Sequence, residues 1–318
     1  MIGRNHHNKY RRSVYKRHSI SAIIISSAVT LLVCAIAMLI FGNILHAKYQ
    51  NENVVDDTQP TDSQESENIP YTPPSSIKAY SVLIETNDSS TFASRIDSLP
   101  DTYKSSVSIP LNTENGTLLY RSDTANSIGI NTGEFSVKLS SVVDIAKSKG
   151  IYLSGVFYVD DFAIEDKLLR QVELSKSSAI ISEALEIGLN EIMIIAPHAT
   201  NDNVNELVRF IDDIKYNTTQ GYVGLSVPDS IFHIEDELLK SEKILQLSKS
   251  ADILAVDMSN VEQEKATEEI AQILKSENIY IHKYKMRLLL PKMLDDETQN
   301  SVISTAESAS LNNWQIIE

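Results

Sequence analysis

The stretch Asn190-Glu-Ile-Met-Ile-Ile-Ala-Pro-His-Ala-Thr200 decides the fold of this 318-residue chain. Its apolar middle, Ile192–Ala196, is short and continuous, and Pro197 ends it. Such a run is typical of a strand that is buried on both faces, as in a parallel sheet covered by helices. Helix-like segments flank it at Leu168–Gly188 and Asn203–Tyr216, so strand and helix alternate around it.

The same alternation continues along the chain from Tyr80 to Ile317 and predicts seven further strands. They are expected at Tyr80–Thr86, Ser106–Leu111, Ile151–Val159, Tyr222–Val227, Ile253–Asp257, Met286–Leu290 and Trp314–Ile317. The other helices are expected at Thr91–Leu99, Ser136–Lys149, Ile234–Lys249, Glu262–Glu277 and Asp296–Ser310, with a hairpin arm at Gly116–Ser122. Eight strands with intervening helices predict an α/β fold, a (β/α)8 TIM-like barrel over residues 77–318. An open doubly wound sheet is the alternative.

Two further expectations concern this barrel. No helical segment follows the last strand, so that strand either stays uncovered or is covered by another segment. No internal sequence repeat is apparent beyond the architectural one.

The N-terminal part of the chain predicts a membrane anchor. Residues 1–19 form a basic tail without acidic side chains, and Ile20–Leu45 carries no charge over more than the ~20 residues that cross a bilayer as a helix. The positive-inside rule places the tail in the cytoplasm and the C-terminal domain outside the cell membrane. A cleaved signal peptide is the alternative. The only cysteine, Cys34, lies within this span, and because a disulfide needs two cysteines, none can form within the chain.

Residues 46–76 are rich in Asp, Glu, Asn, Gln, Ser, Thr and Pro, and predict a disordered linker between the anchor and the barrel. The net charge of the chain is -15, although its tail is basic. An acidic body of this kind excludes a nucleic-acid surface. It suits neutral or cationic ligands better than polyanions.

Polar side chains that follow the predicted strands are the candidate site residues, because barrel enzymes place their chemistry at the carboxyl ends of the strands. The catalytic candidates are Asp257, Asp161 and Glu85. The ligand-binding candidates are His198, Asp160, Asn87 and Lys292. Asp88, Asn112, Glu114 and Asp229 occupy comparable positions. Two carboxylates on different strands can face each other at the ~5–9.5 Å that glycoside hydrolysis uses.

Asp257 is the foremost candidate, because a carboxylate directly after a buried strand is costly unless it is paired or used. The alternative is that it accepts hydrogen bonds from the amides of the Met258–Asn260 loop. Asp160 and Asp161 are neighbours whose side chains point to opposite sides, so at most one of them faces the mouth. The spacing of the histidines predicts no metal site, and no phosphate loop, nucleophile elbow or cofactor fingerprint is present.

Several phrases of the sequence resemble a family. They are Gly116-Thr-Leu-Leu-Tyr-Arg-Ser122, the helix Leu139–Lys149, Gly150-Ile-Tyr-Leu-Ser-Gly-Val-Phe-Tyr-Val-Asp-Asp-Phe162 and Gly188-Leu-Asn-Glu-Ile-Met-Ile-Ile-Ala-Pro197. Together these residues resemble bacterial glycoside hydrolases whose barrel is related to those of alpha-amylase-type and other glycosidases. The resemblance covers roughly residues 80–260 and implies a barrel that acts on carbohydrate.

The chain departs from this family at strand four. The family continues there with an aspartate and an arginine, whereas this sequence has Ile195-Ala-Pro-His198. Strand three lacks the family's arginine at Val156 and Phe157. Glu191 matches the family's glutamate but begins the strand, at the face opposite the active one. Loss of a carboxylate that stabilises an oxocarbenium-like transition state removes the family's reaction, while the fold is kept.

Three functions follow as hypotheses. The first is a membrane-anchored, extracytoplasmic barrel that binds cell-wall or surface carbohydrate with absent or altered catalysis. The second is an active glycoside hydrolase that uses Asp257 with Asp161 or Glu85. The third is a non-enzymatic scaffold that binds a protein partner through its acidic surface. No cofactor is expected in any of them.

Overall fold

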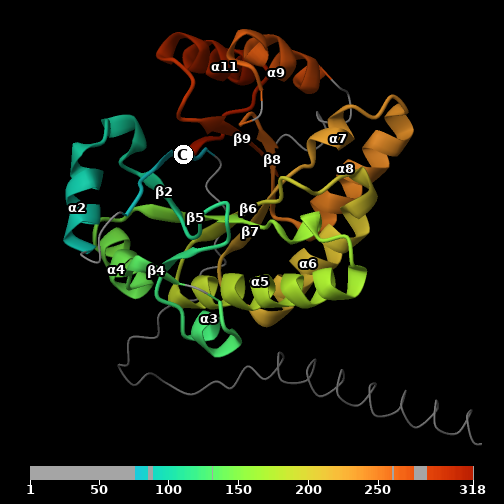
Figure 1. Cartoon of the computed structure of the whole chain (residues 1–318). Coiled ribbons are helices and arrows are strands. Elements are labelled where there is room, and N and C mark those ends of the chain that lie inside the picture. The colour runs from blue at the N-terminus through green and yellow to red at the C-terminus, as the bar shows by residue number, and fades with distance from the viewer. Residues whose placement is uncertain (1–75, 85–88, 131, 260, 276–284, 318) are drawn as a thin grey trace, which may run out of the picture. The chain divides into compact units, whose positions relative to one another are not determined.

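The barrel predicted from the sequence is confirmed. The structure is a computed structural model that describes residues 76–84, 89–130, 132–259, 261–275 and 285–317. Eight parallel strands close in the order β1, β2, β5, β6, β7, β8, β9, β10. Their bounds are Lys78–Ser81, Ser106–Pro110, Tyr152–Tyr158, Glu191–Ile195, Tyr222–Ser226, Ile253–Asp257, Met286–Pro291 and Trp314–Ile317. Helices surround this ring of strands (Figure 1).

The basic tail, the span 20–45 and the linker lie outside the described residues. Among the helices that the structure does describe, none has the length and apolar character to cross a membrane.

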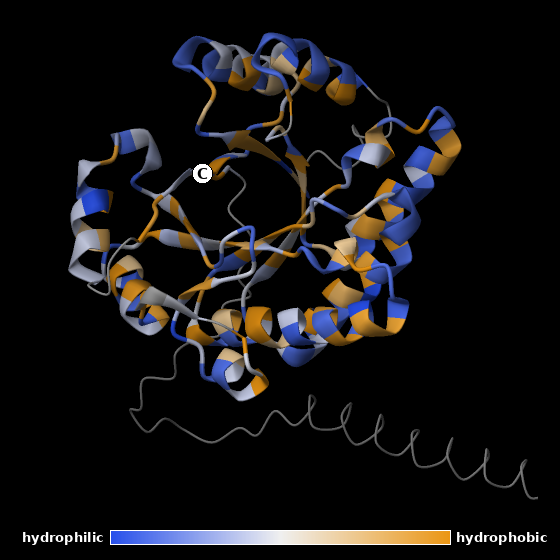
Figure 2. Cartoon of the chain, in the orientation of Figure 1, coloured by the Kyte–Doolittle hydropathy of each residue, from blue (hydrophilic) through white to orange (hydrophobic). Residues whose placement is uncertain are grey.

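Several of the helices that cover the barrel are amphipathic. The bounds of the covering helices are Ser89–Ser98 (α2), Leu139–Ser148 (α4), Lys167–Ile187 (α5), Val204–Asn217 (α6), Glu237–Ser250 (α8), Ala266–Lys275 (α9) and Asp296–Ser308 (α11). Helix α6 buries Val204, Leu207, Phe210, Ile211 and Ile214, which form one stripe at helical spacing. Figure 2 shows the same mixture of apolar and polar residues around the other helices, while the strands are mostly apolar.

Alternation along the strands divides the core into two parts. Side chains that point outward pack under the helices, and those that point inward fill the barrel. Within the barrel Val156, Met193, Ile195, Ala255 and Leu289 belong to one apolar cluster that plugs its centre. Because successive strand residues face opposite sides, the inward position two residues beyond Ala255 is Asp257.

A buried ionic network lies inside the barrel at the start of β6. The Arg287 guanidinium binds both carboxylate oxygens of Glu191, with Nη2 2.8 Å from Oε2. Tyr152 donates to the same carboxylate at 3.0 Å and Ser154 at 3.1 Å. Arg287 also donates to the side-chain oxygen of Gln315 at 3.2 Å. Glu191 is fully buried and Arg287 is 2% exposed, so this glutamate has a structural role in the barrel interior.

The hairpin expected at Gly116–Ser122 is present, and a second strand pairing is added to it. The segments 111–113 and 117–119 pair antiparallel, through the bridge of Asn112 with Leu118 and through hydrogen bonds from the Leu119 amide to the Leu111 carbonyl and from the Thr113 amide to the Thr117 carbonyl. Strand β3 (Leu118–Tyr120) also pairs in parallel with β4 (Thr132–Val137) across the short helix α3 (Asp123–Ile128), which was not expected. The expected helix start at Ser136 falls in β4, and the helix begins at Leu139. The pairing of such short strands is a long-range event, which local sequence patterns do not predict.

Residues of the Gly116–Ser122 segment, which is part of the family resemblance, attach the β3–α3–β4 segment to helix α5. Tyr120 is buried, and its hydroxyl donates to the Ile180 carbonyl of α5 at 3.3 Å. The Ser122 hydroxyl accepts from the Ala125 amide as the N-cap of α3 and donates to Glu183 of α5. Tyr120 and Ser122 in this segment therefore have a structural role, which is packing against α5.

Another segment covers the outer face of the last strand, one of the two outcomes that the sequence left open. Trp314 of β10 is only 3% exposed. The ammonium of Lys78 lies 4.1 Å from the centre of its ring, a cation–π contact. Tyr103, from the turn at Asp101–Tyr103, packs against Tyr80 of β1 with ring centres 5.5 Å apart. The ring of Tyr103, from the connection between β1 and β2, thus covers this side together with Lys78 and Tyr80 of β1.

An internal repeat, which was not expected, links two strand–helix units. Ile164-Glu-Asp-Lys-Leu-Leu-Arg170 recurs seventy positions later as Ile234-Glu-Asp-Glu-Leu-Leu-Lys240. Both aspartates, Asp166 and Asp236, cap their helices, and each accepts hydrogen bonds from two backbone amides of the first turn. The strands before them, β5 and β7, begin with tyrosines that are also seventy positions apart. The two units follow one plan in sequence and in structure.

We expect Glu191→Gln to lower the free energy of unfolding by ~3–5 kcal/mol, because it leaves the Arg287 charge buried without its carboxylate. Urea denaturation of the full-length chain at pH 7 measures the change. The double variant Glu191→Met/Arg287→Met recovers part of the loss, since it removes both charges together. Glu262→Gln, in an exposed pair with Lys265, is the control and changes stability by less than ~1 kcal/mol. A Glu191→Gln variant as stable as this control contradicts the prediction.

Candidate functional site

The carboxyl ends of the strands form the mouth of the barrel, and a cavity of about 280 Å³ lies over β6, β7 and β8. Three carboxylates line it, from Asp229 after β7, Asp257 at the end of β8 and Glu269 in α9. The hydroxyl residues Ser226 and Ser230 also line it. No lysine or arginine is among the described residues of this lining. The cavity is therefore strongly electronegative.

Asp257 ends strand β8 and faces this cavity. Ile253 and Ala255 occupy the barrel interior, so strand alternation turns the carboxyl of Asp257 inward as well. Its Oδ1 accepts a hydrogen bond from the Ser259 amide at 2.8 Å, the loop contact that the sequence offered as the alternative. Burial raises the pKa of Asp257 above its ordinary value, and the charge of Asp229 adds to the rise, while the bond from Ser259 opposes it. The prediction that Asp257 faces the mouth and the alternative loop contact thus both describe this residue.

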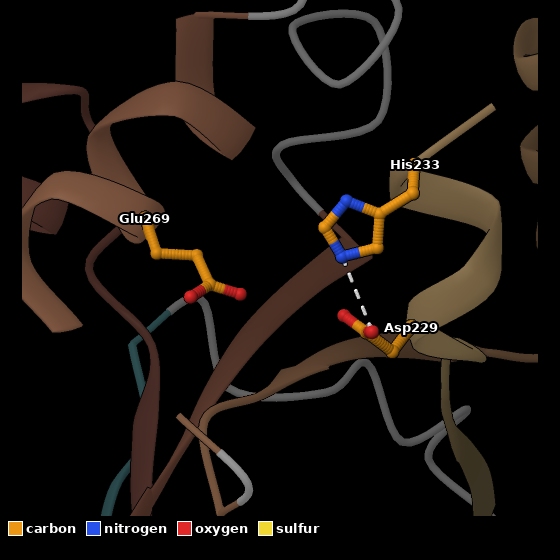
Figure 3. A group of neighbouring side chains, drawn as sticks. All are labelled: Asp229, His233 and Glu269. Carbon is orange, nitrogen blue, oxygen red and sulfur yellow. Dashed lines mark ion pairs between the residues drawn. The ribbon is translucent and has the colours of Figure 1, made fainter. Parts of the chain in front are cut away.

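The side chains of Asp229, His233 and Glu269 converge at the rim of the cavity (Figure 3). Asp229 begins the one-turn helix α7 (Asp229–Phe232). His233 comes directly after this helix, four positions after Asp229. The imidazole Nε2 lies 3.2 Å from Asp229 Oδ2, and the two side chains are 66% and 69% exposed. Glu269 approaches from α9, and the ligand atoms of all three lie within 4.8 Å of one another. These are residue types that bind divalent metal ions.

Two of the predicted ligand-binding residues are brought together at another point of the rim. His198 follows β6 and Asp160 follows β5, and adjacent parallel strands end side by side. The His198 Nε2 lies 3.0 Å from Asp160 Oδ1, with both side chains more than half exposed. Among the described residues, no third His, Cys, Asp or Glu side chain lies close enough to this pair to bind the same metal ion.

Two other predicted residues that the structure describes, Asp161 and Lys292, do not line this cavity. Asp161 begins a 3-10 turn, and its Oδ2 accepts from the Ser177 hydroxyl of α5 at 2.7 Å. Burial raises the pKa of Asp161, but its carboxyl is engaged on the helix side, so the structure does not pair it with Asp257. Lys292 is exposed after β9. Glu85 and Asn87 lie outside the described residues.

A second, smaller hollow of about 170 Å³ lies over β1, β2, β5 and β10. Asn112 and Glu114, which follow β2, line it together with Tyr158. The Asn112 side chain donates to the Tyr158 carbonyl and accepts from the Tyr158 amide, both at 2.8 Å. Asn112 thus extends the pairing of β2 and β5, which accounts for its burial.

Sequence reasoning missed His233 and Glu269. The spacing of Asp229 and His233, four positions apart, is a signal that could have indicated a shared helical face. Glu269 carries no such signal, because only barrel closure brings α9 beside α7. The sequence therefore predicted two residues of the site, Asp257 and Asp229, and the fold adds His233 and Glu269.

Comparison with known proteins agrees with the fold. No family model and no curated protein matches the sequence. Among solved structures, a protein of Bacteroides thetaiotaomicron assigned as an alpha-L-fucosidase has a TM-score of 0.54 at 10% identity, over 77% of this chain and 88% of that one. The spore cortex-lytic enzyme SleL of Bacillus cereus has 0.48 at 9%, over 76% and 71%. An L-ribulose 3-epimerase has 0.47 at 7%, over 76% and 80%. The likeness to the first of these, at 10% identity, shows the (β/α)8 barrel alone.

Proposed function

We propose that this chain is a membrane-anchored, outward-facing barrel that binds cell-wall or surface carbohydrate in the cavity over β6, β7 and β8. The observation that carries the proposal is the inward carboxyl of Asp257 at the mouth of a barrel, in a cavity with other polar groups. Inward polar groups at this face are where barrels hold their ligands. The sequence resemblance to glycoside hydrolases supports carbohydrate as the ligand class.

The lining of the cavity suits one sugar unit. Carboxylate and hydroxyl groups of Asp257, Ser226 and Ser230 offer hydrogen bonds to sugar hydroxyls. Phe232 and Pro228 offer apolar surface on the same lining. The volume of about 280 Å³ is just below the ~300–1,000 Å³ of small-molecule sites, which favours a single ring over a longer segment.

The catalytic apparatus in this proposal differs from the family pattern. At the exit of β6, Ala196 and Pro197 line the cavity where the family has a carboxylate. His198 is held in the pair with Asp160. No acid at this exit is available to stabilise an oxocarbenium-like transition state, so the family's reaction is absent or proceeds with other groups.

A second candidate function is glycoside hydrolysis by a relocated carboxylate pair. Asp257 and Asp229 line one cavity, and burial keeps the pKa of Asp257 raised. A protonated acid beside an ionised carboxylate is the arrangement that glycosidases use. This observation favours an active enzyme whose acids come from β7 and β8.

We expect Asp257→Asn to weaken glycan binding about tenfold or more, because a hydrogen bond to a charged group contributes ~1.5–3 kcal/mol. Co-sedimentation of the full-length chain with insoluble cell walls measures binding, and release of reducing sugar from polysaccharide and cell-wall fragments measures turnover. Asp202→Asn, an exposed acid beyond β6, is the matched control.

The outcomes separate the candidates. Binding without turnover supports the first function, and turnover that Asp257→Asn abolishes supports the second. Absence of both in the parent chain, or equal effects of Asp257→Asn and Asp202→Asn, contradicts the proposal.

We also expect Asp257→Asn to raise the melting temperature at pH 7. A carboxyl whose folded pKa is raised favours the native state below its unfolded pKa and loses that contribution as pH rises through the folded pKa. At pH 7, above the unfolded pKa of an aspartate, the native chain therefore carries the free-energy cost of the raised pKa, which the uncharged amide removes. Thermal melts at pH 7 and at pH 3.5 measure the difference between parent and variant. The difference shrinks at the lower pH, and a variant less stable than its parent at pH 7 contradicts this role.

The outward orientation has its own test. The uncharged span Ile20–Leu45 behind a basic tail supports an anchor with its C-terminal domain outside. Protease added to intact cells is expected to remove the C-terminal domain, and a cytoplasmic marker protein in the same cells stays intact. Protection of the C-terminal domain until the cells are lysed would refute the topology.

A further inference from the structure

The group of Asp229, His233 and Glu269 has the composition and placement of a metal site. It combines one imidazole with two carboxylates, from the unit after β7 and from α9. All three ligand atoms lie within 4.8 Å of one another. Two of the three side chains are well exposed and Glu269 is partly exposed, so an ion could enter from solvent.

A simple surface ion pair does not account for the group. An exposed pair such as His233 with Asp229 contributes only ~0–1 kcal/mol. Glu269 adds a second carboxylate, and it makes no hydrogen bond or ion pair within the described part of the chain. Asp257 places a third carboxylate in the same cavity, whose described lining has no basic side chain. Like charges gathered without a counterion repel one another, and a cation would relieve that cost.

We propose that Asp229, His233 and Glu269 bind a divalent first-row transition metal ion, such as zinc, at the rim of the cavity. The Nε2 to Oδ2 distance of 3.2 Å is close to the ~3.3 Å that separates two ligands of a tetrahedral ion with bonds of ~2.0 Å. Glu269 reaches the same ion by rotation of its flexible side chain. The imidazole favours a transition metal over calcium or magnesium, which prefer oxygen ligands alone.

Three protein ligands leave the ion with an open position, as in zinc sites that act on a bound molecule. Asp229 and Glu269 both line the cavity, so the open position faces it. There the ion takes an oxygen donor, such as a sugar hydroxyl. This last step rests on the proposed carbohydrate function, whereas binding of the ion does not.

The metal site also discriminates between the two candidate functions. Asp229 as a metal ligand cannot serve as the free carboxylate partner of Asp257 in hydrolysis. A bound ion therefore favours carbohydrate binding through the metal over the relocated glycosidase pair.

Calorimetric titration of zinc into the metal-stripped full-length chain tests the site. All proteins carry His6→Ala, His7→Ala and His18→Ala, so that the histidines of the N-terminal tail do not bind the ion. One equivalent is expected to bind, and His233→Ala and Glu269→Gln each weaken it by about tenfold or more, at least the loss that removal of an outer-shell partner causes. Melting curves without zinc check that each variant folds.

The matched control is His198→Ala. His198 forms an equally exposed pair with Asp160 at the same rim, at 3.0 Å, but without a third ligand. Zinc binding that His198→Ala leaves intact and His233→Ala removes supports the site. Absence of binding in the parent chain, or equal losses in the two histidine variants, overturns it.

Cell-wall co-sedimentation with and without a chelator keeps the two proposals apart. Zinc binding without any glycan binding leaves the metal site standing and refutes the carbohydrate function. Glycan binding that is indifferent to chelator, with no zinc bound, refutes the metal site alone.

Discussion

The ion pair between Glu191 and Arg287 is the constraint on which the barrel depends. Both groups are almost fully buried, and a charge in such a place is costly unless it is paired and hydrogen-bonded. Tyr152, Ser154 and Gln315 complete the bonding from β5 and β10. Four strands must therefore present particular residues to the interior at one level. A shift of one residue in any of them would turn its partner outward.

This constraint reaches the candidate site through strand alternation. With Arg287 inward at the start of β9, Leu289 is inward two residues later, and it contributes to the plug with Ala255 of β8. The same alternation carries β8 from Ala255 to Asp257 at the mouth. The carboxyl in the cavity is thus oriented by bonds made at the opposite end of the barrel. The strand register that pairs Glu191 with Arg287 is therefore the same register that places Asp257 in the cavity.

The sequence predicts what local patterns determine. Apolar runs locate seven of the barrel strands closely, whereas β1 spans Lys78–Ser81 and not the predicted Tyr80–Thr86. The position of Asp257 at the end of such a run indicates an inward carboxyl. Contacts between distant residues escape this reasoning. Glu191 and Arg287 are 96 positions apart, and the pairing of β3 with β4 depends on a strand of three residues. Glu269 is an ordinary residue of a polar helix face until the ring closes.

The family resemblance is informative about packing. Tyr120 and Ser122 attach the β3–α3–β4 segment to α5, and Glu191 belongs to the buried ionic network with Arg287. Each of these matching residues has a structural partner, and none of them lines the cavity over β6, β7 and β8. These three residues therefore have structural roles, and they carry no information about chemistry, because fold and function are separable.

The recurrence of one segment at a spacing of seventy residues has a consequence for the rim of the barrel. It belongs to the unit β5–α5 and to the unit β7–α8, whose strands are separated by one strand of the ring. In each unit an aspartate shortly after the strand lies beside a histidine: Asp160 beside His198, and Asp229 beside His233. The two histidines come from different segments, His198 from the exit of β6 and His233 from the end of α7. Among the described residues, Glu269 joins only the second pair, so two units built on one plan present different polar groups to solvent.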